Sequence, residues 1–490
     1  MEPAGSTFFW SFSLFLMLAP LYKAGNRPLL LLLIELVAIG LLLTLAARGA
    51  LRPSWLGLPG PLLVAIGILL SYPLLQLVPM PDAVWRALPG HAPYAAVLER
   101  YAGTAAVGIH RAISVVPSAT EYGWLALLAP LACLLAVQWL APAQVVRLLL
   151  MLTIFTGAEA LLGLVQVGMG GESIFYLRND QAYGTATGTF VNRNHLAAML
   201  AMMLPVIVGL LVYSVLRGRH HHRHQAFALD AEAMSQRVLV FASAVLVLLC
   251  LMFTKSRAGN ASALVGLAFS SILLVRARAG WKHANLVVGG IVVIGLLLAA
   301  LIGLAPILEK WEPDPLRLSA EGRVAISLAT LRGAIEFLPF GSGLSTFASV
   351  FPRFQVEVFG GYIDHAHNDY MQMFMELGLA APVIVALLFV AYARRMTELL
   401  RREPGRSFAV LQIAAGVGLL PLIVHSFFDF SLHMPANAMW YATLAGVMLH
   451  PGLERKPTAG AWQDERKHPD GRKHPDGRKH PDGRKRPQPS

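Results

Sequence analysis

The sequence predicts an all-α integral membrane protein. Of its 490 residues, 56% are hydrophobic and only 14% are charged. A water-soluble protein of this length needs more polar residues to cover its surface. A helix needs roughly 20 apolar residues to cross a bilayer, and runs near that length recur along the chain. Cys133 and Cys250 lie inside such runs, which argues against a disulfide framework and a cysteine-rich metal site.

About 12 of these apolar runs qualify as membrane helices. Their approximate bounds are 6–22, 29–47, 61–79, 120–140, 144–168, 195–216, 237–254, 259–275, 285–305, 369–393, 408–426 and 436–450. The first run lacks a basic leader, so we interpret it as a retained helix, with a cleaved signal peptide as the alternative. The runs together predict a polytopic membrane domain over residues 1–450.

Basic residues lie mainly in alternate gaps between these runs, as the positive-inside rule requires of cytoplasmic loops. This asymmetry places both termini in the cytoplasm and the loop 306–366 outside. Lys23 and Arg27 fall in a short outer turn and oppose the pattern mildly. The net charge of +12 is therefore attributed to membrane topology. No groove-reading motif accompanies it, so nucleic acid is not an expected partner.

The C-terminal segment 451–490 repeats Arg-Lys-His-Pro-Asp-Gly three times, beginning at Arg466, Arg472 and Arg478. Each repeat contains Pro and Gly and no large apolar group, so it does not form a packed core. We predict a disordered basic tail that contacts anionic lipid on the cytoplasmic face.

The outer loop 306–366 is the strongest candidate for function, because long loops without a role are uncommon. Apolar residues recur within it at helical spacing: Val324, Leu328, Leu331, Ile335 and Leu338. They predict an amphipathic helix that lies at the membrane surface or caps a cavity.

Three residues around this loop suggest chemistry. Arg257, in a tight outer turn, offers fixed donors for a phosphate, and its alternative is a snorkelling helix-end arginine. Arg323 opens the amphipathic helix, where a solvated surface arginine is the alternative. His367 is predicted to begin the next membrane helix and to share a face with Tyr370.

His367 lies close in sequence to His365, Asp364 and Asp369. A base with a carboxylate neighbour is therefore one interpretation, and a capping group is the other. Arg193 lies in a segment rich in glycine, hydroxyl and amide groups, which lines a polar site or simply forms a turn. The sequence shows no Ser-His-Asp motif, phosphate loop or clustered zinc spacing, and we expect no metal or cofactor.

Four motifs occur in order: Gly188–His195, Lys255–Gly259, Pro339–Gly343 and His365–Tyr370. This set resembles the bacterial O-antigen ligase and O-antigen polymerase superfamily, over roughly Gly157 to Gly446. The resemblance implies a GT-C-like membrane glycosyltransferase of lipopolysaccharide biosynthesis. It also implies a location in the bacterial inner membrane, with a large periplasmic loop that carries the active site.

The resemblance also implies site residues and partners. His367 matches the family's catalytic histidine, and Arg257 and Arg323 match its diphosphate-binding arginines. The possible supporting residues are Arg193, His365, Asp369 and Tyr370. The implied reaction moves a glycan from undecaprenyl diphosphate to the lipid A core oligosaccharide, with inversion and without metal.

Other functions stay open at this point. The first is an O-antigen or exopolysaccharide polymerase that uses the same donor and a second lipid-linked glycan as acceptor. A protein O-oligosaccharyltransferase comes next. A transporter is the non-enzyme alternative, but the sequence shows no repeated halves of the kind that many transporters contain.

Overall fold

The fold is that of a computed structural model. It describes residues 4–51, 57–102, 110–169, 184–190, 192–221, 231–276, 289, 313–355, 362–401 and 407–452. The described residues up to His450 form one compact unit. The predicted tail repeats lie outside the described residues, and so does the predicted membrane run 285–305 apart from Gly289.

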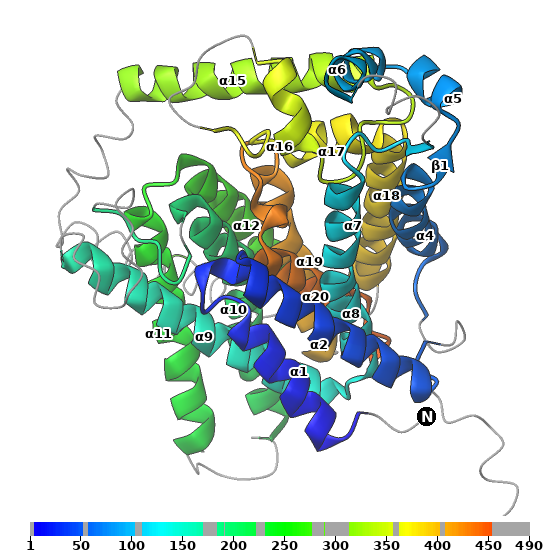
Figure 1. Cartoon of the computed structure of the whole chain (residues 1–490). Coiled ribbons are helices and arrows are strands. Elements are labelled where there is room, and N and C mark those ends of the chain that lie inside the picture. The colour runs from blue at the N-terminus through cyan, green and yellow to red at the C-terminus, as the bar shows by residue number, and fades with distance from the viewer. Residues whose placement is uncertain are drawn as a thin grey trace, which may run out of the picture. The chain divides into compact units, whose positions relative to one another are not determined.

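The described regular structure is almost entirely helical (Figure 1). The α-helices are α1 (Ser6–Leu18), α2 (Pro28–Ala47), α4 (Gly60–Gln76), α5 (Asp82–Ala87), α6 (Ala92–Ala102), α7 (Pro117–Ala126), α8 (Leu128–Trp139), α9 (Pro142–Gly168), α10 (Arg193–His221), α11 (Ala231–Phe253), α12 (Arg257–Arg276), α15 (Pro313–Glu336), α16 (Phe347–Val350), α17 (Asp369–Leu377), α18 (Ala380–Arg401), α19 (Ser407–His425) and α20 (Pro435–Leu449). The 3-10 helices are η1 (Lys23–Gly25), η4 (Phe351–Arg353) and η5 (Ser431–His433). The strands β1 (Pro79–Met80) and β2 (Arg111–Ala112) pair antiparallel.

Helices occupy all the predicted membrane runs that fall within the described residues. Within those residues, 6 segments are long and apolar enough to cross a bilayer, which identifies an integral membrane protein. They are Pro28–Ala47, Pro117–Trp139, Pro142–Gly168, Arg193–Ser214, Met234–Phe253 and Phe408–His425. The predicted total of about 12 spans is not confirmed.

The predicted run 369–393 is not one continuous helix. It divides into α17 and α18 at Gly378, which has φ 55° and ψ −135°. A Cβ atom at this position would lie 2.2 Å from the backbone oxygen of Pro339. Glycine is therefore required here, both for the backbone conformation and for the close approach of the 339–343 loop.

Helix α10 lies at the centre of the bundle and contacts α9, α11, α12, α19 and α20. Its membrane segment is 89% buried, as expected of a helix that is apolar on all sides. Small residues bring it close to α19: a Cβ atom on Gly209 would lie 2.3 Å from the Cβ of Ala414. Helix α10 is thereby packed tightly against α19.

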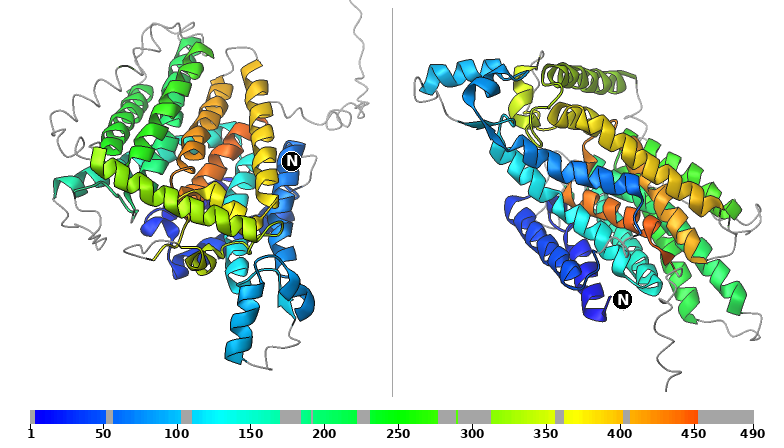
Figure 2. Two further views of the ribbon diagram at one scale, coloured as in Figure 1. Left: turned by 90° about the horizontal axis from the view of Figure 1, so that it is seen from above. Right: turned by 90° about the vertical axis from the view of Figure 1, so that its right-hand side faces the viewer.

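Several connections that the predicted topology places outside meet at this end of the bundle. The backbone N–H of Lys23 donates to Thr189 at 3.1 Å, and that of Asp369 donates to Ser426 at 2.9 Å. Helix α15 packs on α17 and lies across the same end (Figures 1 and 2). The side of the membrane that this end faces stays a prediction.

The predicted amphipathic helix is present as α15, but its apolar stripe is not the face that packs. Val324, Leu328 and Ile335 are 56%, 53% and 59% exposed. The side that packs on the protein carries Ile326, Ala329, Thr330 and Ala334. Helix α15 therefore covers the bundle end with one side and leaves an apolar stripe on another, as a helix at a membrane surface does.

Candidate functional site

A buried carboxylate, Asp429, lies in the connection between α19 and α20. Its side chain is 0% exposed. Asn194 Nδ2 donates to Asp429 Oδ2 at 2.6 Å, and the backbone N–H of Phe430 donates to Oδ1 at 2.9 Å. Burial of a charge costs free energy unless hydrogen-bond partners offset the cost. These two donors offset part of it and fix the orientation of the carboxylate.

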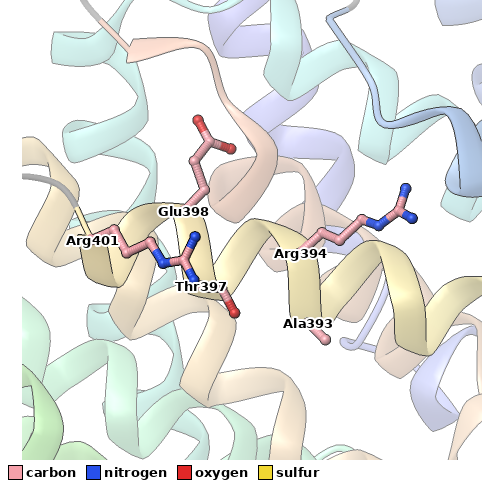
Figure 3. A pocket seen from close by; sticks show the side chains of 5 residues that line it. All are labelled: Ala393, Arg394, Thr397, Glu398 and Arg401. Carbon is pink, nitrogen blue, oxygen red and sulfur yellow. The ribbon is translucent and has the colours of Figure 1, made fainter.

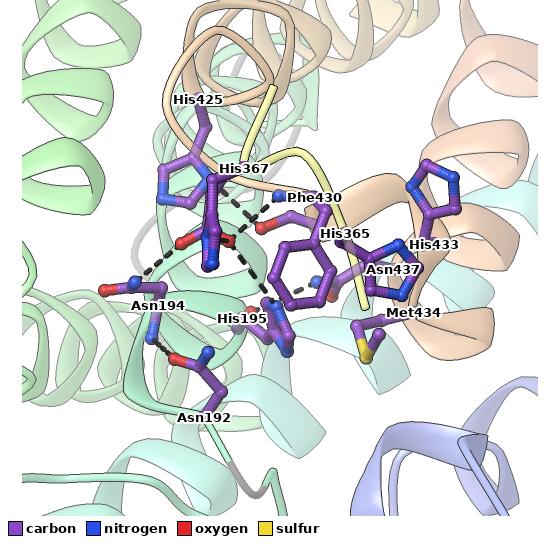
Figure 4. Close-up of polar contacts among 12 residues, drawn as sticks. Asn192, Asn194, His195, His365, His367, His425, Phe430, His433, Met434 and Asn437 are labelled. Atoms are coloured by element: carbon purple, nitrogen blue, oxygen red, sulfur yellow. Dashed lines mark hydrogen bonds and ion pairs between the residues drawn. The ribbon is translucent and has the colours of Figure 1, made fainter. Parts of the chain in front are cut away.

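Two histidines face the same carboxylate oxygen (Figure 4). His367 Nδ1 lies 3.5 Å from Asp429 Oδ1, and His195 Nε2 lies 3.8 Å from it. Burial alone would raise the pKa of Asp429, but the contacts with His195 and His367 hold this pKa well below its usual value. Asp429 is therefore ionised at neutral pH.

His367 owes its position to an unusual backbone conformation. Its φ is 50°, in the left-handed region that a non-glycine residue rarely adopts. Helix α17 begins only at Asp369, and Asn368 caps it by accepting the N–H of Met371 at 3.0 Å. The prediction that His367 begins this helix and shares a face with Tyr370 is therefore wrong, because the chain turns at His367 before the helix starts.

The geometry leaves one nitrogen of His367 available. Nδ1 faces Asp429, and the side chain is 26% exposed. A carboxylate at Nδ1 favours the tautomer with the proton on that atom, so that Nε2 is free to accept one. A base with a carboxylate neighbour was predicted, but the neighbour is Asp429 and not Asp364 or Asp369.

Asp369 pairs with a different histidine. His433 Nδ1 donates to Asp369 Oδ1 at 2.8 Å, and His433 Nε2 lies 3.1 Å from Nε2 of Gln372. This pair connects the start of α17 to η5, and within the described residues it makes no contact with Asp429.

His365 stacks on Phe430, with ring centroids 4.2 Å apart, and its Nδ1 lies 3.2 Å from Gln372 Oε1. Burial, and then the charge of His433, lower the pKa of His365 to about 3. A ring that stays neutral and stacked is a weak base, which favours His367 over His365 as the reactive group.

Tyr370 connects two helices. Its hydroxyl donates to the backbone oxygen of Ile423 at 2.9 Å, and its ring packs on Phe427 at 4.4 Å. These contacts hold α17 against α19.

Three arginines from separate elements come together beside the histidines. Arg257 begins α12, Arg193 begins α10, and Arg323 is half-buried on α15. Burial, and then the charge of Arg323, lower the pKa of Arg257. Arg193 lies within electrostatic range of Arg257, Arg323 and Asp429. Positive charges this close to one another repel, and a bound anion would offset that repulsion.

One nitrogen of this group lacks a partner. Arg257 Nη1 is buried and donates no hydrogen bond to any residue that the structure describes. A buried guanidinium N–H without an acceptor is costly, and an anionic ligand would satisfy it.

The loop before α10 is fixed from α9, which explains how Arg193 and Asn194 are positioned. Glu159 accepts the backbone N–H of Thr189 at 3.0 Å and its hydroxyl at 2.9 Å. Gln166 Oε1 accepts the backbone N–H of Gly188 at 2.8 Å. These bonds hold the 184–190 loop against α9, directly before the start of α10.

A polar cavity of about 640 Å³ adjoins the cluster. It is lined by Lys23, Ala24, Asn26, Arg27, Thr185, Thr187, Asn192, Arg193, Asn194, His195, Asp364, Phe430 and Met434. A second hollow, lined by α18 residues such as Arg394 and Arg401, contains none of the site residues (Figure 3). Over the described ranges, no group of three or more His, Cys, Asp or Glu residues is arranged to hold a metal ion.

Asp429 and His433 lie outside the motifs, and His195 ends the first motif but was not proposed there as a site residue. Asp429 lies among Phe427, Phe428 and Phe430. An ionisable residue beside the end of an apolar run is a signal of function, and it was available in the sequence.

Comparison with known proteins gives one family match. Residues 242–386 match the family model described as O-antigen ligase, and this segment contains Arg257, Arg323 and His367. A search of curated proteins found no match. The family match over residues 242–386 confirms the resemblance to the O-antigen ligase and O-antigen polymerase superfamily that was inferred from the motifs.

Proposed function

We propose that the protein is an O-antigen ligase of the bacterial inner membrane. It transfers a glycan from undecaprenyl diphosphate to the lipid A core oligosaccharide on the periplasmic side. One observation carries the proposal: a histidine paired with a buried carboxylate, His367 with Asp429, lies beside three converging arginines.

The arginines act on the donor. The bond that breaks joins the anomeric carbon of the first sugar to the diphosphate, so negative charge grows on the diphosphate. Arg257 and Arg323 bind this group through their planar guanidinium donors and stabilise the growing charge. The unpartnered Nη1 of Arg257 supports this role. Arg193 adds a third positive charge nearby.

His367 acts on the acceptor. Its Nε2 takes the proton from the attacking hydroxyl while Asp429 stabilises the imidazolium that forms. The new bond forms on the face of the sugar opposite the diphosphate, which leaves with the bonding electron pair. A single displacement of this kind inverts the anomeric centre. The diphosphate is a stable anion, so its departure needs no general acid.

Helix α15 links the two halves of the reaction. It carries Arg323, packs on α17 close to His367, and leaves Val324 and Leu328 exposed. An apolar stripe next to the diphosphate arginines suits a donor that arrives from the membrane with its lipid tail attached.

The test is transfer by the purified protein. With a lipid-linked glycan and a lipid A core acceptor, we expect a ligated glycolipid and free undecaprenyl diphosphate. The Arg394→Gln variant, altered in the α18 hollow, is the matched control and should behave as wild type. No glycan transfer to either lipid A core or a second lipid-linked glycan would contradict the proposal.

A deletion strain separates the two reactions of the family. Loss of attached glycan with intact lipid-linked polymer supports the ligase. Attachment of single repeats only would show that the protein is a polymerase, which takes a second lipid-linked glycan as its acceptor.

A further inference from the structure

We propose that the polar cavity beside the Asp429 cluster binds the acceptor glycan through its negatively charged groups, with Lys23 and Arg27 as binding residues. This inference rests on the proposed function and specifies where the acceptor lies. The chemistry recognised is a phosphate or carboxylate carried on a sugar.

The charge of the cavity supports the proposal. Lys23, Arg27 and Arg193 line it, and Asp364 is the acidic residue among its lining residues. Neither Lys23 nor Arg27 forms an ion pair with any described residue. The volume of about 640 Å³ is typical of a small-molecule site. An excess of positive charge in such a cavity attracts anionic ligands.

The turn that carries these residues is held in a strained conformation. Lys23, Ala24 and Gly25 all have positive φ, at 50°, 56° and 81°. Non-glycine residues rarely adopt this conformation and persist in it where the surroundings impose it.

Packing imposes the conformation here. Ala24 is 1% exposed, and the N–H of Lys23 donates to Thr189 at 3.1 Å. A Cβ atom on Gly25 would lie 2.9 Å from Ile34 Cδ1. The fold therefore fixes Lys23 at the cavity wall.

Topology supports the same assignment. The predicted orientation places Lys23 and Arg27 outside, where the positive-inside rule disfavours basic residues. Their presence in this turn is thus not explained by membrane orientation. A binding role in the adjoining cavity explains it.

The position of the cavity favours the acceptor over the donor. His195 and Asn194 line the cavity and also contact Asp429, the partner of His367. Of the three arginines beside the histidines, Arg193 lines the cavity, whereas Arg257 and Arg323, the proposed diphosphate-binding residues, do not. The cavity therefore adjoins the proposed base, and the acceptor hydroxyl is the group that the base must meet.

The experiment compares two acceptors. One is lipid A core oligosaccharide with its phosphate groups, and the other is the same acceptor after phosphatase treatment. For Lys23→Gln and Arg27→Gln we expect KM for the phosphorylated acceptor to rise about 10-fold, as the loss of one charge-assisted hydrogen bond predicts. KM for the treated acceptor, KM for the donor and kcat should stay unchanged.

Two controls sharpen the comparison. Asp364→Asn removes the acidic group from the cavity wall and should lower KM for the phosphorylated acceptor, an effect of opposite sign. Arg394→Gln removes a cation from the distant α18 hollow and should change neither KM.

Equal KM values for wild type, Lys23→Gln and Arg27→Gln would overturn the inference, and so would a rise confined to KM for the donor. Absence of transfer by the wild type would instead contradict the proposed function. In that case, the role of the cavity is tested by measuring the binding of fluorescent phosphorylated core oligosaccharide to the protein in nanodiscs. Weaker binding by the two variants supports the cavity, and equal binding overturns it.

Discussion

Two carboxylate–histidine pairs lie close together, and they differ in what their free atoms can do. His433 and Asp369 are 2.8 Å apart, and Gln372 occupies the other nitrogen of His433. His367 and Asp429 are 3.5 Å apart, and the side chain of His367 is 26% exposed. The pair His433–Asp369 holds α17 against η5 and uses both nitrogens of its histidine. The pair His367–Asp429 leaves Nε2 of His367 available. Availability, and not the shortest distance, is our ground for proposing His367 as the reactive histidine.

The largest expected effect follows from removing the available nitrogen. His367→Ala should lower kcat by about 10²–10⁴-fold, the usual contribution of a general base. The measurement is single-turnover transfer with saturating donor and acceptor, and the thermal melt checks that the variant folds. Full activity in a folded His367→Ala protein would remove the histidine from the mechanism.

A smaller loss is expected when the carboxylate is neutralised without a change of shape. Asp429→Asn should lower kcat by roughly 10²-fold and leave KM for the donor unchanged, because an amide does not stabilise the imidazolium. A change in donor KM alone would show that Asp429 serves binding and not the base.

The arginines belong to neither carboxylate–histidine pair, and their replacement should affect the donor. Arg257→Gln and Arg323→Gln should each lower kcat/KM about 10–100-fold, since each loses hydrogen bonds to a charged group worth about 1.5–3 kcal/mol. Donor binding is measured with the lipid-linked glycan alone. Unchanged donor affinity and turnover in both variants would exclude the diphosphate role.

The tighter pair should affect stability more than catalysis. His433→Gln should lower the melting temperature, with a loss of about 1–3 kcal/mol for leaving Asp369 without its partner. Transfer per folded molecule should stay close to wild type. A large loss of kcat in a stable His433→Gln protein would mean that this pair, too, takes part in the reaction.

The same pair predicts a pH dependence of stability. Burial opposes the charged ring, but the hydrogen bond and charge of Asp369 raise the pKa of His433 above its usual value. The stabilisation is fully present below the unfolded pKa of about 6.5 and is lost as pH rises through the raised folded pKa. As pH rises through this range, the melting temperature of His433→Gln should fall less steeply than that of the wild type.

The smallest effect is expected at the neighbouring histidine. His365→Phe keeps the stacking on Phe430, and the ring that it replaces is already neutral because its pKa is about 3. Transfer rates should stay within about threefold of wild type. A loss as large as that of His367→Ala would reverse the assignment of the base.

Sequence patterns predicted the parts of this molecule that depend on local order. The apolar runs gave helix positions because a helix buries residues that are close in sequence. The family resemblance also singled out Arg257, Arg323 and His367, which no residue spacing connects. That these three residues lie near one another could be seen only in the folded structure.

The parts that sequence did not predict depend on long-range contacts. Asp429 meets His367 across 62 positions of the chain, and its role follows from packing between α17 and the α19–α20 connection. The left-handed backbone conformation at His367 belongs to a single residue, so no periodic sequence pattern predicts it. For α15, the apolar stripe was taken from spacing alone, yet the protein packs on the side that carries Ala329 and Ala334.

The most direct test of the account is a double-mutant cycle on kcat with His367→Ala, Asp429→Asn and the double variant. If Asp429 acts through His367, the double variant should be no slower than His367→Ala alone. Losses that simply multiply in the double variant would show that the two residues act independently and would contradict the pair as the source of the base.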